Sequence, residues 1–458
     1  MEALIIVVFV LGYLAITLEH SLRVDKLVPA LIMMAICWAC ISIGIDNFPT
    51  WFDSSNHSLV DDFASLTHDN KMHFLEETLL HHLGKTAEIL VFLLGAMTIV
   101  EIIAYFNGFS TIKSFIQTKK KIKLLWIFCW LAFVLSAIID NLTATIVLIS
   151  LLQKLVSDQK FRIWIAGLVV ISANAGGAFS PIGDVTTTML WIADKVTTPY
   201  LFGYLLLPSL ACMLVPTYFA SRLSVFKGEV EVDDDKQDGQ GPFSAIMLYL
   251  GLSAIVFVPV FKMFTHLPPY VGMMLSLGIV AIFAEIYSRS QFSLTGLDKN
   301  GHSSPVHHSL SKIELPSILF FLGILMAVAA LESLGILFGF ANFLKDTMPN
   351  IGTEVAGTAI SDLVVILLGI GSAIIDNVPL VAASLGMFAE PTDNILWHFI
   401  AYSAGTGGSM LIIGSAAGVV AMGMERINFF WYLKNISWLA LIGFLSGALV
   451  FFFTRTML

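Results

Sequence analysis

The amino-acid sequence predicts an all-α polytopic membrane protein with two inverted-topology repeats, each containing a re-entrant helical hairpin and a Gly-broken transmembrane helix. Three observations predict this fold. The 458 residues are 57% hydrophobic and only 12% charged, whereas soluble domains carry about 25% charged residues. Most apolar runs are about 17 to 25 residues long, the length of a membrane-spanning helix. The hexapeptide Ser-Ala-Ile-Ile-Asp-Asn occurs twice, at 136–141 and 372–377.

The N-terminal region, 1–85, is predicted to hold two spans and a polar extracytoplasmic loop. The spans are expected at 5–18 and 27–45, joined by a short segment that carries Arg23 and Lys26. The polar stretch after them is acidic, contains histidines and suits a loop or a surface helix on the non-cytoplasmic face. We expect no cleavable signal peptide, because the first span lacks a preceding basic region and a small-residue cleavage site.

The first repeat is predicted at 86–226. A hairpin is expected at 124–156, with Asp140 and Asn141 at its tip. Lysines and an arginine flank both ends of this hairpin, and such residues mark the cytoplasm, so the hairpin is expected to open inwards. A broken helix is expected at 163–191, because its glycines and proline disfavour a continuous helix. The glycines would equally permit close helix approach, so both interpretations stay open.

The connection between the repeats consists of an acidic cytoplasmic linker at 227–242 and two spans with a cytoplasmic loop at 243–313. The aspartates of the linker do not have EF-hand spacing, which disfavours a calcium site. His302, His307 and His308 could bind a metal, but their serine-rich surroundings favour a solvated loop. The four cysteines lie in apolar segments and indicate packing residues.

The second repeat is predicted at 314–458, with a hairpin at 358–389 and a broken helix at 395–424. Acidic residues flank this hairpin, with Lys345 as the lone nearby cation, so the hairpin is expected to open outwards. The two repeats then have the same order of elements in opposite orientations. Inverted repeats with broken helices at the bilayer midplane are typical of secondary transporters.

The two hexapeptides place carboxylates within apolar sequence. A charged side chain at the bilayer centre costs on the order of 3 kcal/mol, so Asp140 and Asp376 are candidates for a functional site. The alternative is that each Asp-Asn pair only caps the helix that follows the tip, since both residues are good N-caps. Capping and ion binding can coexist.

Sodium requires several hard oxygen ligands, which carboxylates, amides, hydroxyls and unwound backbone supply. The candidate cation ligands of the first half are Asp140, Asn141, Thr143, Ser172, Asn174 and Asp184. The candidates of the second half are Asp376, Asn377, Ser403, Thr406 and Ser409. Because a desolvated carboxyl group readily holds a proton, the predicted proton-coupling residues are Asp140, Asp184 and Asp376.

The two halves are not equivalent. In the aligned repeats, Ser415 stands where the first half has Asp184, and Gly405 stands where it has Asn174. The first half therefore has an extra carboxylate and an extra amide, and sodium is predicted to bind at Asp140, Asn141, Thr143, Asn174 and Asp184.

Four further titratable residues lie in or beside the spans. Glu101 and Glu332 occur in matching spans and could relay protons, although an interface or packing role is favoured. His398 and Glu425 flank the second broken helix and are predicted to be boundary residues.

The paired hexapeptides and the paired Ser-Ala-X-X-Gly-Gly stretches at 172–177 and 403–408 resemble NhaD-type sodium/proton antiporters. These belong to the ion transporter superfamily, which also includes arsenite permeases and dicarboxylate transporters. The dicarboxylate branch typically has Ser-Asn-Thr at its hairpin tips, so the Asp-Asn tips here favour the antiporter branch.

The resemblance implies exchange of cytoplasmic Na⁺ or Li⁺ for external H⁺ by alternating access, in the service of pH homeostasis. It implies a homodimer in the bacterial inner (cytoplasmic) membrane, with an elevator-like transport domain. No enzymatic activity, cofactor or nucleic-acid partner is expected beyond the transported Na⁺ and H⁺.

The alternative function is a sodium-coupled permease for a dicarboxylate or an oxyanion, because hairpin tips that present helix N-termini suit anions. The sequence disfavours it, since we expect no intramembrane Arg or Lys beside the three buried carboxylates. A channel is disfavoured because re-entrant elements of channels do not need titratable groups on broken helices.

Overall fold

The computed structural model describes residues 1–54, 58–60, 62–113, 116, 118–230, 241, 243–295 and 304–457. Most of the predicted acidic linker, and His302, lie outside these residues. The described chain is mainly helical and contains one short antiparallel pair of strands, β1 (Phe52–Asp53) and β2 (Ser58–Leu59). The all-α part of the predicted fold class is confirmed.

Eight of the described helices are long and apolar enough to cross a membrane: α4 (His68–Tyr105), α6 (Lys121–Ile139), α8 (Gln159–Ala178), α10 (Thr198–Ser221), α11 (Ser244–Thr265), α12 (Pro269–Thr295), α14 (Leu315–Ser333) and α22 (Ser437–Thr454). The shorter apolar helices are α1 (Glu2–Thr17), α3 (Leu27–Ile43), α7 (Asn141–Leu155), α17 (Asp362–Gly371), α18 (Asn377–Met387) and α20 (Ala416–Glu425). Large apolar side chains stay exposed on them, such as Leu11 at 60% on α1. Such surfaces are unfavourable in water and suit lipid, so the chain is a multi-pass membrane protein.

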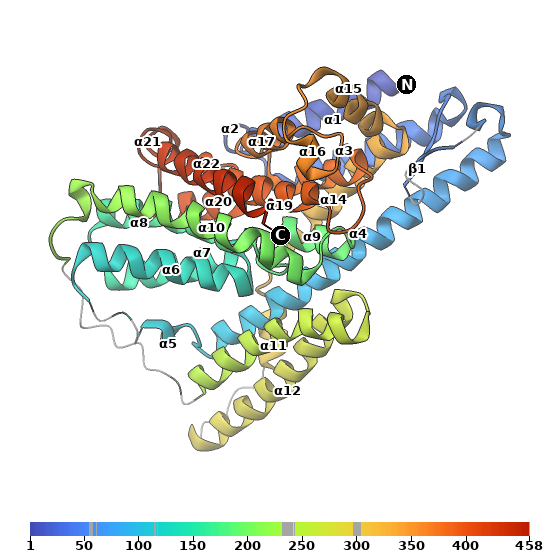
Figure 1. Cartoon of the computed structure of the whole chain (residues 1–458). Coiled ribbons are helices and arrows are strands. Elements are labelled where there is room, and N and C mark those ends of the chain that lie inside the picture. Colours follow the sequence, from blue (N-terminus) through green and yellow to red (C-terminus); the bar gives the residue numbers. More distant parts are fainter. Residues whose placement is uncertain are drawn as a thin grey trace.

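The helices form two groups (Figure 1). The scaffold group consists of α1, α3, α4, α11, α12 and α14, which pack mainly on one another. The core group consists of α6 to α10, with α9 at Val185–Ile192, and of α17, α18, α19 (Ile395–Gly407), α20 and α22. The long α4 runs diagonally past the core towards α11 and α12 (Figure 1).

Within the scaffold group, one helix of each repeat packs on a helix that lies outside that repeat. Helix α4 of the first half packs on α12, and α14 of the second half packs on α3. Gly95 permits the first contact, since a Cβ there would lie 2.7 Å from Met273 of α12. Gly323 permits the second, since a Cβ there would lie 2.8 Å from the backbone of Ala30. Small residues at these crossings allow close helix approach in a membrane.

Helix α4 is continuous across the predicted boundary between residues 85 and 86. Its 38 residues correspond to a length of about 57 Å at the usual rise per residue. The polar part of the predicted N-terminal loop, from His68 to Lys85, is therefore the first half of a long helix and not a separate loop. Helix formation here follows the local sequence, which contains neither proline nor a run of β-branched residues.

Each hexapeptide lies at the turn between two helices, α6 and α7 in the first half and α17 and α18 in the second. Both arms of each pair pack on the broken helix of their own half, which is α8 or α19. The serines of the hexapeptides fix this contact. Ser136 Oγ donates to the carbonyl of Ala173 at 2.5 Å, and Ser372 Oγ donates to that of Ala404 at 3.2 Å.

The two broken segments run in opposite directions through the core. The start of α8 lies beside the end of α20, where Arg162 Nε is 3.0 Å from Glu425 Oε1. The start of α19 lies beside the end of α9, where the amide of Thr197 donates to Asp393 Oδ1 at 2.6 Å. The beginning of each broken segment is thus held to the end of the other.

The breaks occupy only a short part of the predicted broken helices at 163–191 and 395–424. Helix α8 continues to Ala178 and α9 begins at Val185; in the second half, α19 ends at Gly407, the short helix η4 (Gly408–Met410) follows, and α20 begins at Ala416. Gly176 and Gly407 stay helical. A Cβ on either glycine would collide with the backbone of the adjacent hairpin arm, at Phe133 or Gly369. At these two positions, close helix approach is the structural reason for glycine.

Candidate functional site

Both hairpin-tip aspartates cap the helix that follows them. Asp140 accepts two hydrogen bonds from Thr143, from the amide to Oδ1 and from the hydroxyl to Oδ2, each at 2.8 Å. Asp376 Oδ1 accepts one, from the amide of Val378 at 3.4 Å. A helix start in an apolar setting leaves unpaired N–H groups, and these caps provide hydrogen-bond acceptors for them. Each aspartate still has lone pairs free for an ion.

The first hairpin tip is linked to the second half of the chain. Asn141 Nδ2 donates to Asn174 Oδ1 at 3.0 Å, and Asn174 Nδ2 donates to Ser415 Oγ at 3.0 Å. All three side chains are buried. The candidate ligands Asn141 and Asn174 therefore lie together, as the sequence suggested, and their network ends on the cap residue of α20.

The second hairpin tip is linked to the first half. Asn377 Nδ2 donates to Asp184 Oδ2 at 3.2 Å, while Asp184 Oδ1 accepts from the amide of Thr186 at 3.3 Å and so caps α9. Gly405 lies beside the same carboxylate, since a Cβ there would be 3.5 Å from Asp184 Oδ2. Asp184 is only 2% exposed.

The candidate site is thus shared between the halves. The sequence analysis placed Asp184 and Asn377 in different groups, and the structure brings them into hydrogen-bond contact. The antiparallel course of the broken segments explains this, because the start of α9 meets the hairpin tip of the other half. Asp184 also lies within electrostatic reach of both Asp376 and Asp140.

The three carboxylates do not converge on one point. Among the residues that the structure describes, no group of three or more His, Cys, Asp or Glu side chains is placed to hold a metal ion. The arrangement instead sets one buried carboxylate, that of Asp184, among amides and hydroxyls. Thr186 Oγ1 next to it is buried without a hydrogen-bond partner in the described part of the chain.

The remaining candidate ligands mostly bond to their own helices. The hydroxyls of Ser172, Thr406 and Ser409 donate to the carbonyls of Leu168, Tyr402 and Thr406, respectively. The hydroxyl of Ser403 is buried and has no hydrogen-bond partner among the described residues. Of these second-half candidates, Asn377 therefore contacts the shared centre directly. Ser403, Thr406 and Ser409 do not bond to it.

Lys26 is a site residue that the sequence analysis missed. Its Nζ lies 3.3 Å from Asp376 Oδ2 and 4.4 Å from the centroid of the Phe320 ring. The expectation that no lysine stands beside the buried carboxylates is wrong for this tip. The sequence showed Lys26 only as part of a polar connection, because its partner lies 350 residues away. The one available signal was its position directly before the apolar run of α3.

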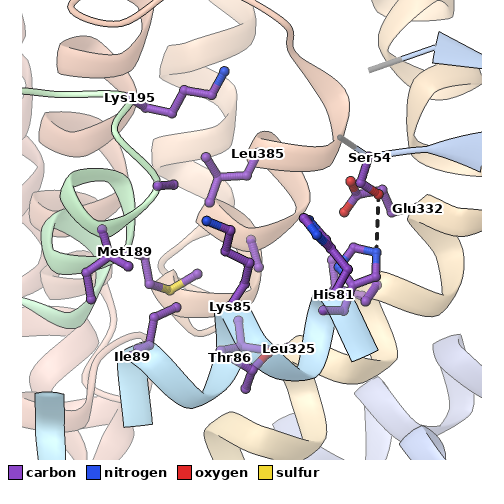
Figure 2. Close-up of a pocket in the computed structure, with 16 residues that line it drawn as sticks. Ser54, His81, Lys85, Thr86, Ile89, Met189, Lys195, Leu325, Glu332 and Leu385 are labelled. Carbon is purple, nitrogen blue, oxygen red and sulfur yellow. Dashed lines mark hydrogen bonds between the residues drawn. The ribbon is translucent and has the colours of Figure 1, made fainter. Parts of the chain in front are cut away.

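A pocket of about 210 Å³ opens between the scaffold and core groups, near the second hairpin. It is lined by residues of α4, α9, α14 and α18, among them Lys85, Met189, Glu332 and Leu385 (Figure 2). Ser54 lies beside Glu332, and its Oγ is 3.2 Å from His82 Nε2. Glu332, for which a packing role was favoured, therefore faces a pocket lined by both polar and apolar residues. The pocket also reaches α18, the helix that begins at Asn377.

Two polar clamps hold the beginning of each broken segment to the end of the other. Glu425 is buried and accepts both contacts from Arg162 Nε, at 3.0 and 3.2 Å. At the opposite end, His398 Nε2 lies 3.5 Å from Asp393 Oδ1, and Asp393 accepts from Thr197. Burial acts to raise the pKa of Asp393, but the hydrogen bonds from His398 and Thr197 outweigh it and lower that pKa. His398 and Glu425, predicted as boundary residues, are both buried clamp residues.

His308 and Glu101 lie at the C-terminal end of α4. His308 is in α13 (Pro305–Leu310), and its ring packs against Tyr105 at 5.1 Å. Glu101 is within electrostatic reach of Lys312 and His308. Glu101 is thus on a scaffold helix, and α13 packs against that helix.

Comparison with known proteins identifies the family to which this chain belongs. A family model described as "Citrate transporter" (CitMHS) matches residues 6–398. The chain belongs to this citrate transporter family. Members of the family are transporters, so the protein is a transporter and not an enzyme.

Relatives of the chain extend the comparison. "Sodium/proton antiporter 1" and "Sodium/proton antiporter 2" of Arabidopsis thaliana are 41% and 37% identical to it, covering 96% and 97% of this chain and 70% and 97% of their own lengths. "Na(+)/H(+) antiporter NhaD" of Vibrio cholerae is 30% identical and covers 95% of this chain and 88% of that protein. The resemblance to NhaD-type antiporters is confirmed.

A solved structure also matches. The YdaH transporter of Alcanivorax borkumensis, described as having an unusual topology, gives a TM-score of 0.54 over 93% of this chain and 95% of that one. Its sequence identity is 14%, so this likeness concerns the fold alone.

Proposed function

We propose that this member of the citrate transporter family exchanges Na⁺ for H⁺ across a membrane by alternating access. One observation carries the proposal: Asp184 is buried between the two hairpin tips, hydrogen-bonded to Asn377 and within electrostatic reach of Asp140 and Asp376. A buried carboxylate near two like charges is strongly favoured to bind a proton or a cation. Either ion satisfies it, so the two compete.

The proposed cation ligands centre on Asp184. Its carboxylate supplies the charge, and the amide oxygen of Asn377 and the unpartnered hydroxyl of Thr186 supply neutral oxygens. The ligand set derived from the sequence, Asp140, Asn141, Thr143, Asn174 and Asp184, stays part of the proposal. The contact with Asn377 adds the second half of the chain to it. Relatives named as sodium/proton antiporters support Na⁺ and H⁺ as the exchanged ions.

The proposed orientation places the first hairpin opening to the cytoplasm and the second to the outside, as an inverted-topology repeat. The antiparallel broken segments support it, as do the lysines around the first hairpin. The pocket that contains Glu332 would then lie on the external path. The division into scaffold and core groups supports an elevator-like motion of the core. A homodimer, and Li⁺ as a second cation, follow from the resemblance to NhaD-type antiporters.

The bacterial cytoplasmic membrane stays a prediction. Relatives come from a plant as well as from bacteria, so they do not favour one membrane over another.

A sodium-coupled permease for a dicarboxylate is the second candidate. Two observations favour it over a channel: the family model is described as a citrate transporter, and Lys26 stands beside the second hairpin tip. A lysine at a helix start suits a carboxylate ligand. Lys26 is, however, already paired with Asp376, which leaves less positive charge for an anionic substrate.

Transport in proteoliposomes separates the candidates. Vesicles with an imposed pH gradient and an entrapped pH-sensitive dye would receive Na⁺, Li⁺, K⁺, citrate or succinate. We expect Na⁺ and Li⁺ to dissipate the gradient, and K⁺, citrate or succinate without Na⁺ to leave it intact. Sodium-dependent uptake of labelled citrate or succinate, with no response of the gradient to Na⁺ alone, would favour the permease instead.

A further inference from the structure

The ion pair between Lys26 and Asp376 crosses the boundary between the scaffold and core groups. Lys26 is the residue directly before α3, a scaffold helix, and Asp376 is the cap of α18, a core helix. The two clamps described above lie wholly within the core, whereas this contact must change if the core moves against the scaffold. The pair is also mostly withdrawn from solvent, with side-chain exposures of 21% and 14%.

The surroundings of Asp376 contain few other charges. Its titratable neighbours are Lys26 before α3, Tyr13 on α1 and Asp184 at the start of α9. Helix α14 contributes the uncharged ring of Phe320, over which the Lys26 ammonium lies. Among the described residues, no other lysine or arginine forms an ion pair with Asp376, Asp184 or Asp140. Lys26 is therefore the counter-charge of the second tip in this conformation.

A buried carboxylate cannot readily lose its only counter-charge. Separating such a pair leaves one uncompensated charge in a medium of low polarity, which is strongly unfavourable. The penalty disappears if another cation takes the place of the ammonium group. A proton on the carboxyl group or a bound Na⁺ would serve equally well.

We propose that Lys26 is a positioning residue that couples movement of the core to ion occupancy. It acts as the built-in cation of Asp376 in this conformation, and Asp376 leaves it only when a proton or Na⁺ has replaced it. The core group therefore does not move across the membrane while Asp376 is charged and has no bound cation. This inference rests on the proposed exchange of Na⁺ for H⁺ and adds the device that would make the exchange obligatory.

The chain offers a matched control in Lys262. This scaffold lysine also reaches the core, where its Nζ contacts the carbonyl of Trp191 at 2.8 Å and Asp194 Oδ1 at 2.7 Å. Asp194 lies outside the shared centre, and its side chain is 77% exposed. Lys262 thus bridges the same two groups without touching a carboxylate of the site. A purely mechanical role for lysine bridges would make the two residues equivalent.

The test compares the pH profile of Na⁺-driven exchange for wild type, Lys26→Met, Lys26→Arg and Lys262→Met in proteoliposomes. Without the ammonium group, the Asp376 carboxylate loses the positive charge that opposes proton binding, so Na⁺ competes with H⁺ there only at lower H⁺ concentration. We expect Lys26→Met to move the half-maximal point by about one pH unit or more towards alkaline pH. Lys26→Arg should restore the wild-type profile, and Lys262→Met should change the rate without moving the profile.

The same substitution in an Asp376→Asn background decides whether Lys26 acts through Asp376. We expect Lys26→Met to cause no further displacement there. A Lys26→Met profile superimposed on that of wild type, or an equal displacement in the Asp376→Asn background, would overturn the inference. If Lys26→Met does not reconstitute, as judged by gel filtration and thermal melting, Lys26→Gln takes its place. A wild-type protein without any Na⁺-driven exchange would defeat the proposed function itself, whereas an active wild type with an unmoved profile defeats only this coupling role.

Discussion

The two hairpin tips have the same six residues and different chemistry. Asp140 has φ of 83° and ψ of 157°, a region that costs a non-glycine residue on the order of 1–3 kcal/mol, and it accepts two short hydrogen bonds from Thr143. Asp376 has φ of −47° and one long cap bond. The first tip is strained and tightly held, whereas the second is relaxed and loosely capped.

The charged neighbours of the tips differ in sign. Glu314, the residue directly before α14, lies within electrostatic reach of Asp140. Lys26, the residue directly before α3, pairs with Asp376. The first tip thus has a negatively charged neighbour, while the second is paired with a cation. The identical hexapeptides acquire different surroundings through the scaffold helices that begin beside them.

The largest effect is expected for the cap residues of the broken helices. Asp184→Asn removes the central carboxylate and should lower the Na⁺/H⁺ exchange rate about 100-fold, equivalent to roughly 2.8 kcal/mol. Ser415→Ala, at the matching position of the second half, removes a neutral partner of Asn174 and should lower it only a few-fold. Exchange assays on both variants check this. Equal losses would show that the halves contribute alike.

The second-largest effect is expected from substitution of the two hairpin-tip asparagines, Asn377 and Asn141. Asn377 bonds to a carboxylate and Asn141 bonds to a neutral amide. Hydrogen bonds to charged groups are worth about 1.5–3 kcal/mol and neutral ones about 0.5–1.5 kcal/mol. Asn377→Ala should therefore raise the half-saturating Na⁺ concentration more than Asn141→Ala. The reverse order would favour the first-half ligand set that the sequence predicted, without a contribution from Asn377.

The clamp at Asp393 should stabilise the protein to an extent that depends on pH. Because the pKa of Asp393 is lowered in the folded protein, its stabilising effect is present above its unfolded pKa of about 3.9 and is lost as the pH falls through the folded value. Asp393→Asn should lower the melting temperature at neutral pH, and this deficit should shrink in strong acid. Melting curves across this range are the measurement. A deficit that does not vary with pH would indicate a role that is independent of the charge of Asp393.

The smallest effect is expected for Glu314. Removing its negative charge favours the ionised form of Asp140, so Na⁺ can bind at a higher proton concentration. Glu314→Gln should move the pH profile of exchange slightly towards acid, opposite in direction to Lys26→Met. The shift should be small because Glu314 is exposed and its charge is screened. Shifts in the same direction for the two variants would contradict the assigned charge asymmetry.

Much of this architecture could be predicted from the sequence, because it depends on local patterns. Apolar runs predicted helices, and the repeated hexapeptide located both tips. The contact of Asn377 with Asp184 could not be predicted, since it joins residues 193 positions apart in different halves. Lys26 was missed for the same reason. The continuity of α4 was hidden because its first half is polar, and that polarity suited a loop as well as a separate surface helix.

The measurement that tests the shared centre most directly is equilibrium binding of Na⁺ to the purified protein, followed by calorimetry or with ²²Na⁺. We expect saturable binding by wild type that is lost in Asp184→Asn, weakened in Asn377→Ala and largely retained in Ser415→Ala. Binding of Na⁺ to Asp184→Asn with the wild-type affinity would contradict a cation site built around Asp184 by both halves of the chain.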